Sequence, residues 1–282
     1  MRIPGWEAHG AAERLIIVNG AKGGVGTTTV AFNLAVQWGH LTGKRVAPLE
    51  FARPFGQISL MLDFSPRFTL LDALERVNRL DVALLASMLT RHKSAIEILV
   101  GHLHAAMRAE QRQLITIEAL LRVLELACEA FDLVVVDLGF VNAAEWASIL
   151  KTADALLLVA EPTELAVGML KRYLGAVDSS GIARARFQIV IHRALRSDEE
   201  PVAPSDNNLK QSFFARLPND FRQVSEAVTL GIPLLTSSKS SLVGRYRDLA
   251  ARLLAQPPRN ATVNAGSSAN SPATASVSAA AK

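Results

Sequence analysis

The residues best suited to chemistry form a glycine-rich segment near the start of the chain, at positions 16–29. An apolar run leads into a turn with four glycines, and three consecutive threonines then open a helical pattern. Glycines let the backbone curl so that successive N–H groups point into one concavity, and the positive end of a following helix adds to it. This order is typical of a P-loop that binds nucleotide phosphates. The residues predicted to bind the nucleotide in this loop are Lys22, Gly23, Gly24, Val25, Gly26, Thr27, Thr28 and Thr29.

Two oxygen-bearing side chains are candidates for a magnesium site beside this loop. Thr28 occupies the position whose hydroxyl ligates Mg²⁺ in a P-loop. Asp137 ends an apolar run at 133–136, where the carboxyl end of a parallel strand meets the ligand crevice. An aspartate at that place supports the magnesium shell in P-loop proteins. The alternatives are a purely structural turn at the glycines and a helix cap or loop aspartate at position 137.

Thr27 departs from the usual P-loop pattern, which has a lysine directly before the metal-binding hydroxyl residue. A hydroxyl group donates one hydrogen bond but carries no charge. We therefore expect both the affinity for phosphate and the stabilisation of a transition state to fall.

Strands and helices that alternate along the chain must position these residues. The predicted fold class is α/β, a mostly parallel twisted sheet with helices on both faces, because the strands are continuous apolar runs. Pro48 lies inside the second predicted strand and predicts a bulge or a gap in the pairing there. The predicted strands are 15–18, 46–51, 96–100, 131–137, 155–160, 187–191 and 231–235. The predicted helices are 30–42, 70–77, 82–89, 117–130, 165–177 and 242–254, the second with a capping box at Thr69 and Asp72.

The composition predicts one globular domain over residues 13–256, with a short leader at 1–12 and a disordered tail at 257–282. No apolar run approaches the roughly 18–20 residues of a membrane span, and the start lacks the apolar core of a secretory signal. We therefore expect a cytoplasmic protein. The net charge of +4 is too mild to indicate a specific nucleic-acid partner. The single cysteine, Cys128, is predicted to be buried.

The glycine loop and its threonines resemble the deviant Walker A box of the ParA/MinD group of P-loop ATPases. Within that group, the stretches 55–60 and 217–221 are similar to the pilus-assembly proteins called CpaE or TadZ, and the resemblance spans roughly residues 13–255. It implies ATP or ADP with Mg²⁺ as cofactors. It also implies a homodimer in which Lys22 reaches the phosphates of the partner subunit. The further implied partners are proteins of a Flp/Tad-type (type IVb) pilus and secretion machine, with peripheral recruitment from the cytoplasm to the inner membrane or a cell pole.

Two further positions depart from that family's pattern. Relatives end the second strand in Asp-x-Asp, which includes the residue that orients the attacking water, whereas this chain has Glu50-Phe51-Ala52. Glu50 keeps a carboxylate and is the one catalytic candidate, while Ala52 has no group that positions water. His192 stands where relatives present an asparagine to adenine. We expect it to make one hydrogen bond with the base, and the alternative is a core or surface histidine.

Three hypotheses follow from these residues. The leading one is a nucleotide-responsive, ATP-binding localisation or assembly factor for a Flp/Tad pilus, with weak or no hydrolysis, so that enzyme status stays open. The second is an active ParA/MinD-type ATPase that partitions or positions cargo on nucleoid or membrane. The third is a pseudo-ATPase that binds no nucleotide and serves as an interaction module. His102 and His104 lack the further ligands that a metal site needs, and the helix at 242–254 is interpreted as the last packed helix.

Overall fold

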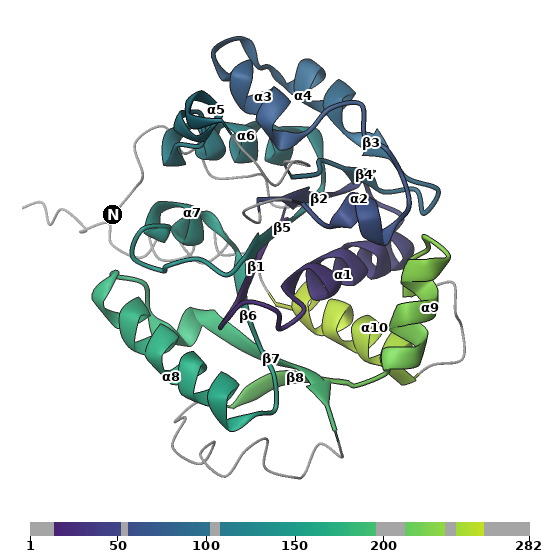
Figure 1. Cartoon of the computed structure of the whole chain (residues 1–282), viewed down its shortest axis with the longest axis vertical. Coiled ribbons are helices and arrows are strands. Elements are labelled where there is room, and N and C mark those ends of the chain that lie inside the picture. The colour runs from purple at the N-terminus through teal and green to yellow at the C-terminus, as the bar shows by residue number, and fades with distance from the viewer. Residues whose placement is uncertain (1–13, 52–55, 102–107, 196–211, 235–240, 257–282) are drawn as a thin grey trace, which may run out of the picture.

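A single parallel sheet runs through the centre of the molecule (Figure 1). We describe a computed structural model, in which residues 14–51, 56–101, 108–195, 212–234 and 241–256 are placed. Six strands pair in parallel in the order β2-β5-β1-β6-β7-β8. They are β1 (Arg14–Gly20), β2 (Val46–Glu50), β5 (Leu133–Gly139), β6 (Ala155–Ala160), β7 (Phe187–Ala194) and β8 (Phe213–Pro218). A two-stranded antiparallel pair, β3 (Thr90–Arg91) and β4 (Glu97–Ile98), lies beside β2.

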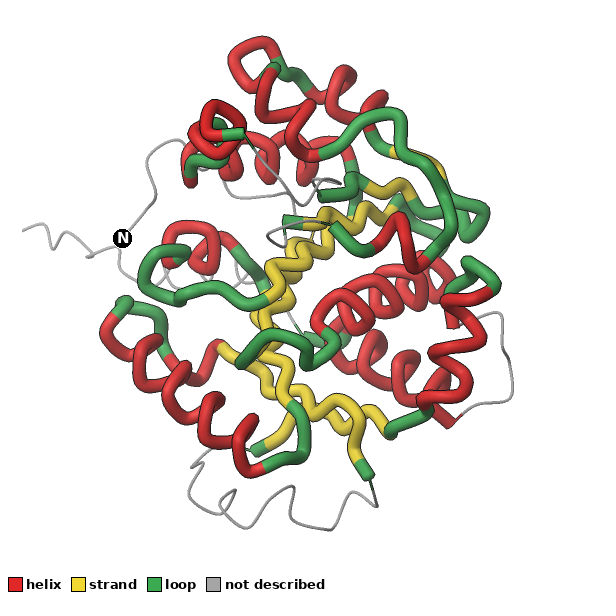
Figure 2. The backbone as a smooth tube through the Cα atoms, in the orientation of Figure 1, coloured by secondary structure: helices red, strands yellow, loops and turns green. Residues whose placement is uncertain are grey.

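Helices cover both faces of the sheet, as the red helices on either side of the yellow strands in Figure 2 show. Along β1, Leu15 and Ile17 face one apolar core, and Ile16 and Val18 face the other. The first core takes α3, α4, α6, α7 and α8, and the second takes α1, α2, α9 and α10. The helices are α1 (Thr27–Thr42), α2 (Ile58–Met61), α3 (Leu70–Glu75), α4 (Val82–Met88), α5 (Ala109–Gln113), α6 (Ile117–Ala130), α7 (Ala147–Thr152), α8 (Glu164–Ser179), α9 (Phe221–Thr229) and α10 (Ser241–Leu254), with 3₁₀ turns at Val77–Arg79 and Arg184–Arg186.

This architecture confirms the predicted fold class, a mostly parallel sheet between helical layers. The capping box at the start of α3 also forms, since the Thr69 side chain accepts from the Asp72 N–H and the Asp72 side chain accepts from the Thr69 N–H. Pro48 lies in β2 without a shift of register against β5. The N–H of Glu50, two residues on, donates outward to Leu99. The donor that Pro48 lacks therefore falls on the side of β2 that faces Leu99, so the pairing with β5 is kept.

The strand predicted at 231–235 is wrong for its described residues 231–234, and the sixth place in the sheet belongs to β8. Gly231 has a φ of 58°, a left-handed conformation that does not fit a strand. A Cβ added to it would lie 2.7 Å from the Asp63 side chain. The N–H of Leu234 donates to Asn33 on α1 instead of to a strand. The predicted strand at 96–100 pairs with β3 as β4 at 97–98, and it continues in single bridges from Leu99 to Leu49 and from Val100 to Thr69.

The last helix packs on the first, as expected. The Trp38 indole N–H donates to the Ala250 carbonyl oxygen at 2.9 Å, and Tyr246 is fully buried. Arg14, at the start of β1, donates to the carbonyl oxygens of Leu253 and Leu254 at the end of α10. Among the described helices, none combines the length and the apolar character that crossing a bilayer requires. Cys128 on α6 is buried, as predicted.

Candidate nucleotide-binding site

The loop between β1 and α1 has the backbone of a phosphate-binding turn. Gly24 and Gly26 have φ values of 82° and 90°, which residues with a Cβ rarely adopt. Gly26 is the N-cap of α1, and no side chain caps this helix. A Cβ added at Gly23 or Gly24 would meet no atom within 4 Å, so this side of the loop is open. The uncapped helix end and the open glycines suit a bound anion.

Thr28 and Asp137 meet across the edge of the sheet, as the sequence predicts. The Thr28 hydroxyl donates to Asp137 Oδ2 at 2.5 Å, and the Gly139 N–H donates to Asp137 Oδ1 at 2.9 Å. Burial raises the pKa of Asp137 to about 7, and the nearby Glu50 adds to the shift, while the bonds from Thr28 and Gly139 oppose it. A hydroxyl and a carboxylate are hard oxygen donors of the kind that Mg²⁺ takes, so the pair fits the proposed metal.

Thr27 fills the position where the usual pattern has a lysine. Its side chain is buried, at 7% exposed, and its Oγ1 would lie 2.7 Å from a Cβ added at Gly20. The threonine therefore packs under the loop, where only a glycine at position 20 leaves room for it. No cationic group stands at this position of the P-loop.

Glu50, the catalytic candidate, is fully buried and its two carboxylate oxygens accept backbone N–H groups. Oε1 accepts from Gln57 at 2.6 Å and from Ile58 at 3.1 Å, and Oε2 accepts from Gly101 at 2.9 Å. Burial raises the pKa of Glu50, and these three bonds oppose the shift. A carboxylate saturated in this way anchors the backbone at the end of β2. The geometry therefore gives Glu50 a structural role, and a catalytic role for it stays a prediction.

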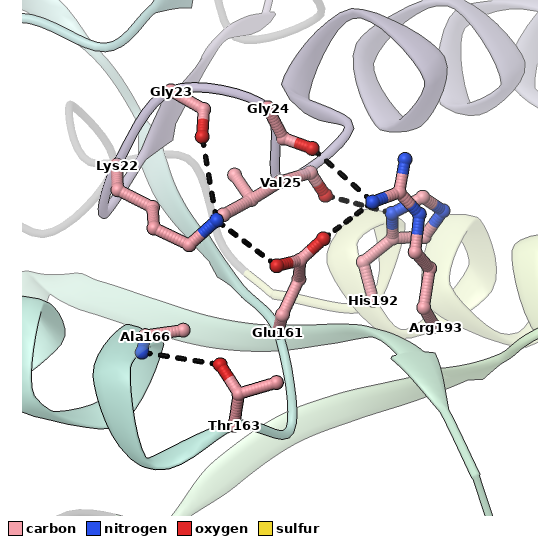
Figure 3. Close-up of polar contacts among 9 residues, drawn as sticks. All are labelled: Lys22, Gly23, Gly24, Val25, Glu161, Thr163, Ala166, His192 and Arg193. Atoms are coloured by element: carbon pink, nitrogen blue, oxygen red, sulfur yellow. Dashed lines mark hydrogen bonds and ion pairs between the residues drawn. The ribbon is translucent and has the colours of Figure 1, made fainter.

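Lys22 takes part in an ion cluster on the β6–β7 side of the loop (Figure 3). Its Nζ lies 3.0 Å from Glu161 Oε2, and the other Glu161 oxygen pairs with Arg193. Arg193 Nη1 also donates to the carbonyl oxygen of Gly24 at 3.2 Å. Burial alone would raise the pKa of Glu161, but the two cations outweigh it and the pKa is lowered. Glu161 is therefore an ionised carboxylate held between two cations.

His192 lies beneath the loop rather than at the surface. Its Nδ1 is 2.8 Å from the carbonyl oxygen of Val25, and the residue is 4% exposed. A carbonyl only accepts, so Nδ1 carries the proton. Burial lowers the pKa of His192, which keeps the ring neutral. A contact of this ring with adenine stays a prediction, because its described hydrogen bond goes to the loop itself.

Proteins named MinD and ParA are similar to this chain in sequence and in fold. No protein-family model matches the chain. The septum site-determining protein MinD of Synechocystis sp. is 24% identical over 252 residues, which cover 86% of this chain and 90% of that protein. A ParA family ATPase from Chlorobium tepidum superposes with a TM-score of 0.75 at 22% identity, over 86% of this chain and 99% of that one. The fold is that of the ParA/MinD ATPases. MinD from Pyrococcus horikoshii, solved with Mg-ADP, has a TM-score of 0.66 at 22% identity, over 86% of this chain and 96% of that one.

The sequence did not identify Glu161 or Arg193 as a residue of the nucleotide site. In the ParA/MinD fold, both lie at the carboxyl ends of strands, which point to the ligand crevice. That position, just beyond the predicted strands at 155–160 and 187–191, is the signal that could have found them. The position in the sequence does not predict the backbone conformation of Arg193, which has a φ of 59°.

Several sequence candidates lie outside the described residues. These are Ala52 and the pair His102 and His104, together with the predicted leader and tail. Within the described ranges there is no group of three or more histidine, cysteine, aspartate or glutamate side chains that could hold a metal by themselves. The magnesium proposed at Thr28 and Asp137 therefore depends on phosphate oxygens for further ligands.

Proposed function

We propose that this chain is a nucleotide-controlled positioning protein of the ParA/MinD type, which binds ATP and ADP with Mg²⁺. The observation that carries the proposal is the 2.5 Å contact between Thr28 on the P-loop helix and Asp137 on β5. This contact brings one oxygen from the phosphate-binding loop and one from the end of β5 together, where both could support a metal ion. The likeness to MinD solved with Mg-ADP supports the same cofactors.

The residues of the loop divide the work of binding. Backbone N–H groups from Gly24 to Thr29 and the N-terminal end of α1 would hold the phosphates. Thr28 would give its hydroxyl oxygen to Mg²⁺, and Asp137 would accept from the waters around the ion. When bound, Mg²⁺ neutralises charge on the phosphates. Its charge would also draw the proton from Asp137, whose pKa of about 7 leaves it partly protonated near neutral pH.

Hydrolysis in this proposal is slow. Thr27 brings no charge to the phosphates, and the Glu50 carboxylate is saturated by three backbone N–H groups. A residue that neutralises charge in the transition state contributes several kcal/mol to a rate, roughly 10²–10³-fold for a single donor. We therefore expect the chain to release bound ATP more often than it hydrolyses it.

Positioning is favoured over pilus assembly by the names of the relatives, which include a septum site-determining protein and a ParA family ATPase. The pilus role is a narrower proposal that rests on the resemblance of the stretches 55–60 and 217–221 alone. A homodimer, with Lys22 leaving Glu161 for the partner's phosphates, is part of the proposal, as is recruitment to the inner membrane or a pole.

Calorimetric titration with ATP and ADP, with and without Mg²⁺, tests nucleotide binding. We expect Mg²⁺ to tighten the wild-type affinity, and Asp137→Asn and Thr28→Val to abolish that gain. Asp178→Asn, which changes an exposed ion pair on α8, is the matched control. Absence of binding at millimolar nucleotide would refute the proposal. Turnover near 1 per second, roughly the low end of ordinary enzymes, would refute slow hydrolysis and support the hypothesis of an active ATPase.

The positioning role has its own test in the native cells. A fluorescent fusion of the wild-type chain should gather at particular sites, and the Asp137→Asn fusion should spread uniformly. Equal distributions of the two fusions would contradict nucleotide control of position. Deleting the pilus genes of such cells, if they carry them, separates the two roles, because a positioning protein keeps its pattern without a pilus.

A further inference from the structure

Two consecutive residues at the end of β7 both reach the phosphate loop. Side chains of a regular strand alternate between faces, so neighbours point in opposite directions. Here the register between β7 and β8 shifts between His192 and Ala194, and Arg193 has a φ of 59°. This bulge turns Arg193 back toward the loop that His192 already contacts (Figure 3). Bulges that aim side chains in this way recur next to ligand sites.

The two residues hold adjacent peptide groups of the loop by their carbonyl oxygens. His192 Nδ1 bonds to the oxygen of Val25 at 2.8 Å, and Arg193 Nη1 to the oxygen of Gly24 at 3.2 Å. The carbonyl and the N–H of a trans peptide point in opposite directions. Carbonyls fixed toward β7 therefore aim the N–H groups of Val25 and Gly26 away from β7. A cationic donor on a carbonyl also polarises that peptide, which makes its N–H a stronger donor.

The fit between the loop and this strand end is close. A Cβ added at Gly26 would collide with the His192 ring, so the glycine is required for the approach as well as for its φ. Glu161 fixes the other end of the arrangement, because it pairs with Arg193 and with Lys22 at once. The loop is thus held at Lys22, Gly24 and Val25 by groups from β7 and from the turn after β6.

We propose that His192 and Arg193 are positioning residues of the P-loop, which act on bound phosphate through the peptides that they hold. The proposal rests on nucleotide binding as proposed above. It makes the charged Arg193 a partial substitute for the lysine replaced by Thr27, since its charge reaches the phosphates through the Gly24–Val25 peptide. Glu161 keeps Arg193 in place. No contact of either side chain with the adenine base is needed.

Tripolyphosphate, which has phosphates but no base, separates this role from base recognition. Arg193→Met and His192→Phe should each weaken Mg-ATP and Mg-tripolyphosphate by the same factor, about 10-fold for a lost bond of roughly 1.4 kcal/mol. Arg193→Lys keeps a charged donor and should recover most of the loss. Arg122→Met, which breaks an exposed ion pair on α6, is the control and should leave both affinities unchanged. A loss confined to ATP would overturn the proposal in favour of adenine recognition, and unchanged affinities would overturn it outright.

Hydrogen exchange at an amide bonded to the loop gives a readout that needs no ligand. In Arg193→Met, exchange at the N–H of Val30, which donates to the loop carbonyl of Gly26 at 2.9 Å, should accelerate several-fold while the urea midpoint of the whole chain stays at the wild-type value. Unchanged exchange refutes the positioning role. If the wild-type chain binds neither ATP nor tripolyphosphate, nucleotide binding itself fails. The exchange result then decides by itself whether the β7 residues hold the loop. The Arg193 side chain is half-exposed, so we expect Arg193→Met to fold. The proposal can therefore be tested with this variant even if His192→Phe does not fold.

Discussion

Replacing Asp137 with asparagine should stabilise the fold, and by an amount that depends on pH. The folded-state pKa of Asp137 is about 7 against an ordinary 3.8. Between these values the folded chain binds the proton that the unfolded chain has released, so this group makes stability fall as pH rises. The full difference of about 3 pKa units corresponds to roughly 4 kcal/mol above pH 7. An asparagine side chain at this position is neutral at every pH and does not carry this cost.

Urea denaturation of wild type and Asp137→Asn at pH 5, 6, 7 and 8 measures the effect. The stability advantage of the variant should grow by about 2–3 kcal/mol from pH 5 to pH 8, because most of the titration lies in that window. Asp178→Asn serves as the control, because Asp178 is a carboxylate that is more than half exposed. An Asp137→Asn advantage that stays constant from pH 5 to pH 8 would refute the reasoning that burial dominates at this carboxylate.

Adding Mg-ATP should narrow the difference in stability between the two proteins. A ligand at 100 times its dissociation constant stabilises the folded state by about 2.7 kcal/mol. Wild type should gain this at pH 8 in full, and Asp137→Asn should gain much less, because the side chain that supports the metal has lost its charge. An equal gain for both would place the magnesium elsewhere.

Three further predictions concern the loop and its surroundings. Glu50→Gln should lower the free energy of unfolding by about 2 kcal/mol, since an amide N–H₂ would face the N–H of Gly101; an unchanged urea midpoint would contradict it. Gly26→Ala should destabilise the chain by at least about 1 kcal/mol and weaken phosphate binding, and His192→Ala in the same chain should restore part of both losses in calorimetry; no restoration would show that the collision is not the cause. Thr27→Lys should tighten Mg-ATP about 10-fold in the same titration, and an unchanged affinity would mean that the longer side chain cannot reach the phosphates.

The parts of the fold that depend on local pattern were predictable from the sequence. Continuous apolar runs identified the central strands, and a 3.6-residue period gave α6 its bounds. The strand prediction at 231–235 was wrong because an apolar segment after a glycine has the same sequence pattern whether it pairs with a strand or packs against helices. Its place was decided by the left-handed Gly231 and by Asn33. β8 was missed as a strand because its sequence, Phe-Phe-Ala-Arg-Leu-Pro, has no clear alternation.

Some residues of the site were predictable from the sequence and others were not, for the same reason. The loop, Thr28 and Asp137 follow from motif and strand position, because backbone geometry requires particular residue types at fixed spacing. The saturation of Glu50 was not predictable, since its partners at 57, 58 and 101 are set by how separate segments meet. The ion cluster of Lys22, Glu161 and Arg193 likewise joins three strand ends, and no local pattern records which charges will face one another.

The bond of Arg14 to the end of α10 has a mechanical consequence. β1 carries the phosphate loop at its carboxyl end, and at its other end Arg14 holds the last turn of the final helix through Leu253 and Leu254. Tension applied to the chain beyond residue 256 would therefore load the central strand directly, in line with the loop. A tether, a fusion tag or a bound partner pulling on that segment would act on the bonds of Arg14 and, through them, on the strand that carries the phosphate loop.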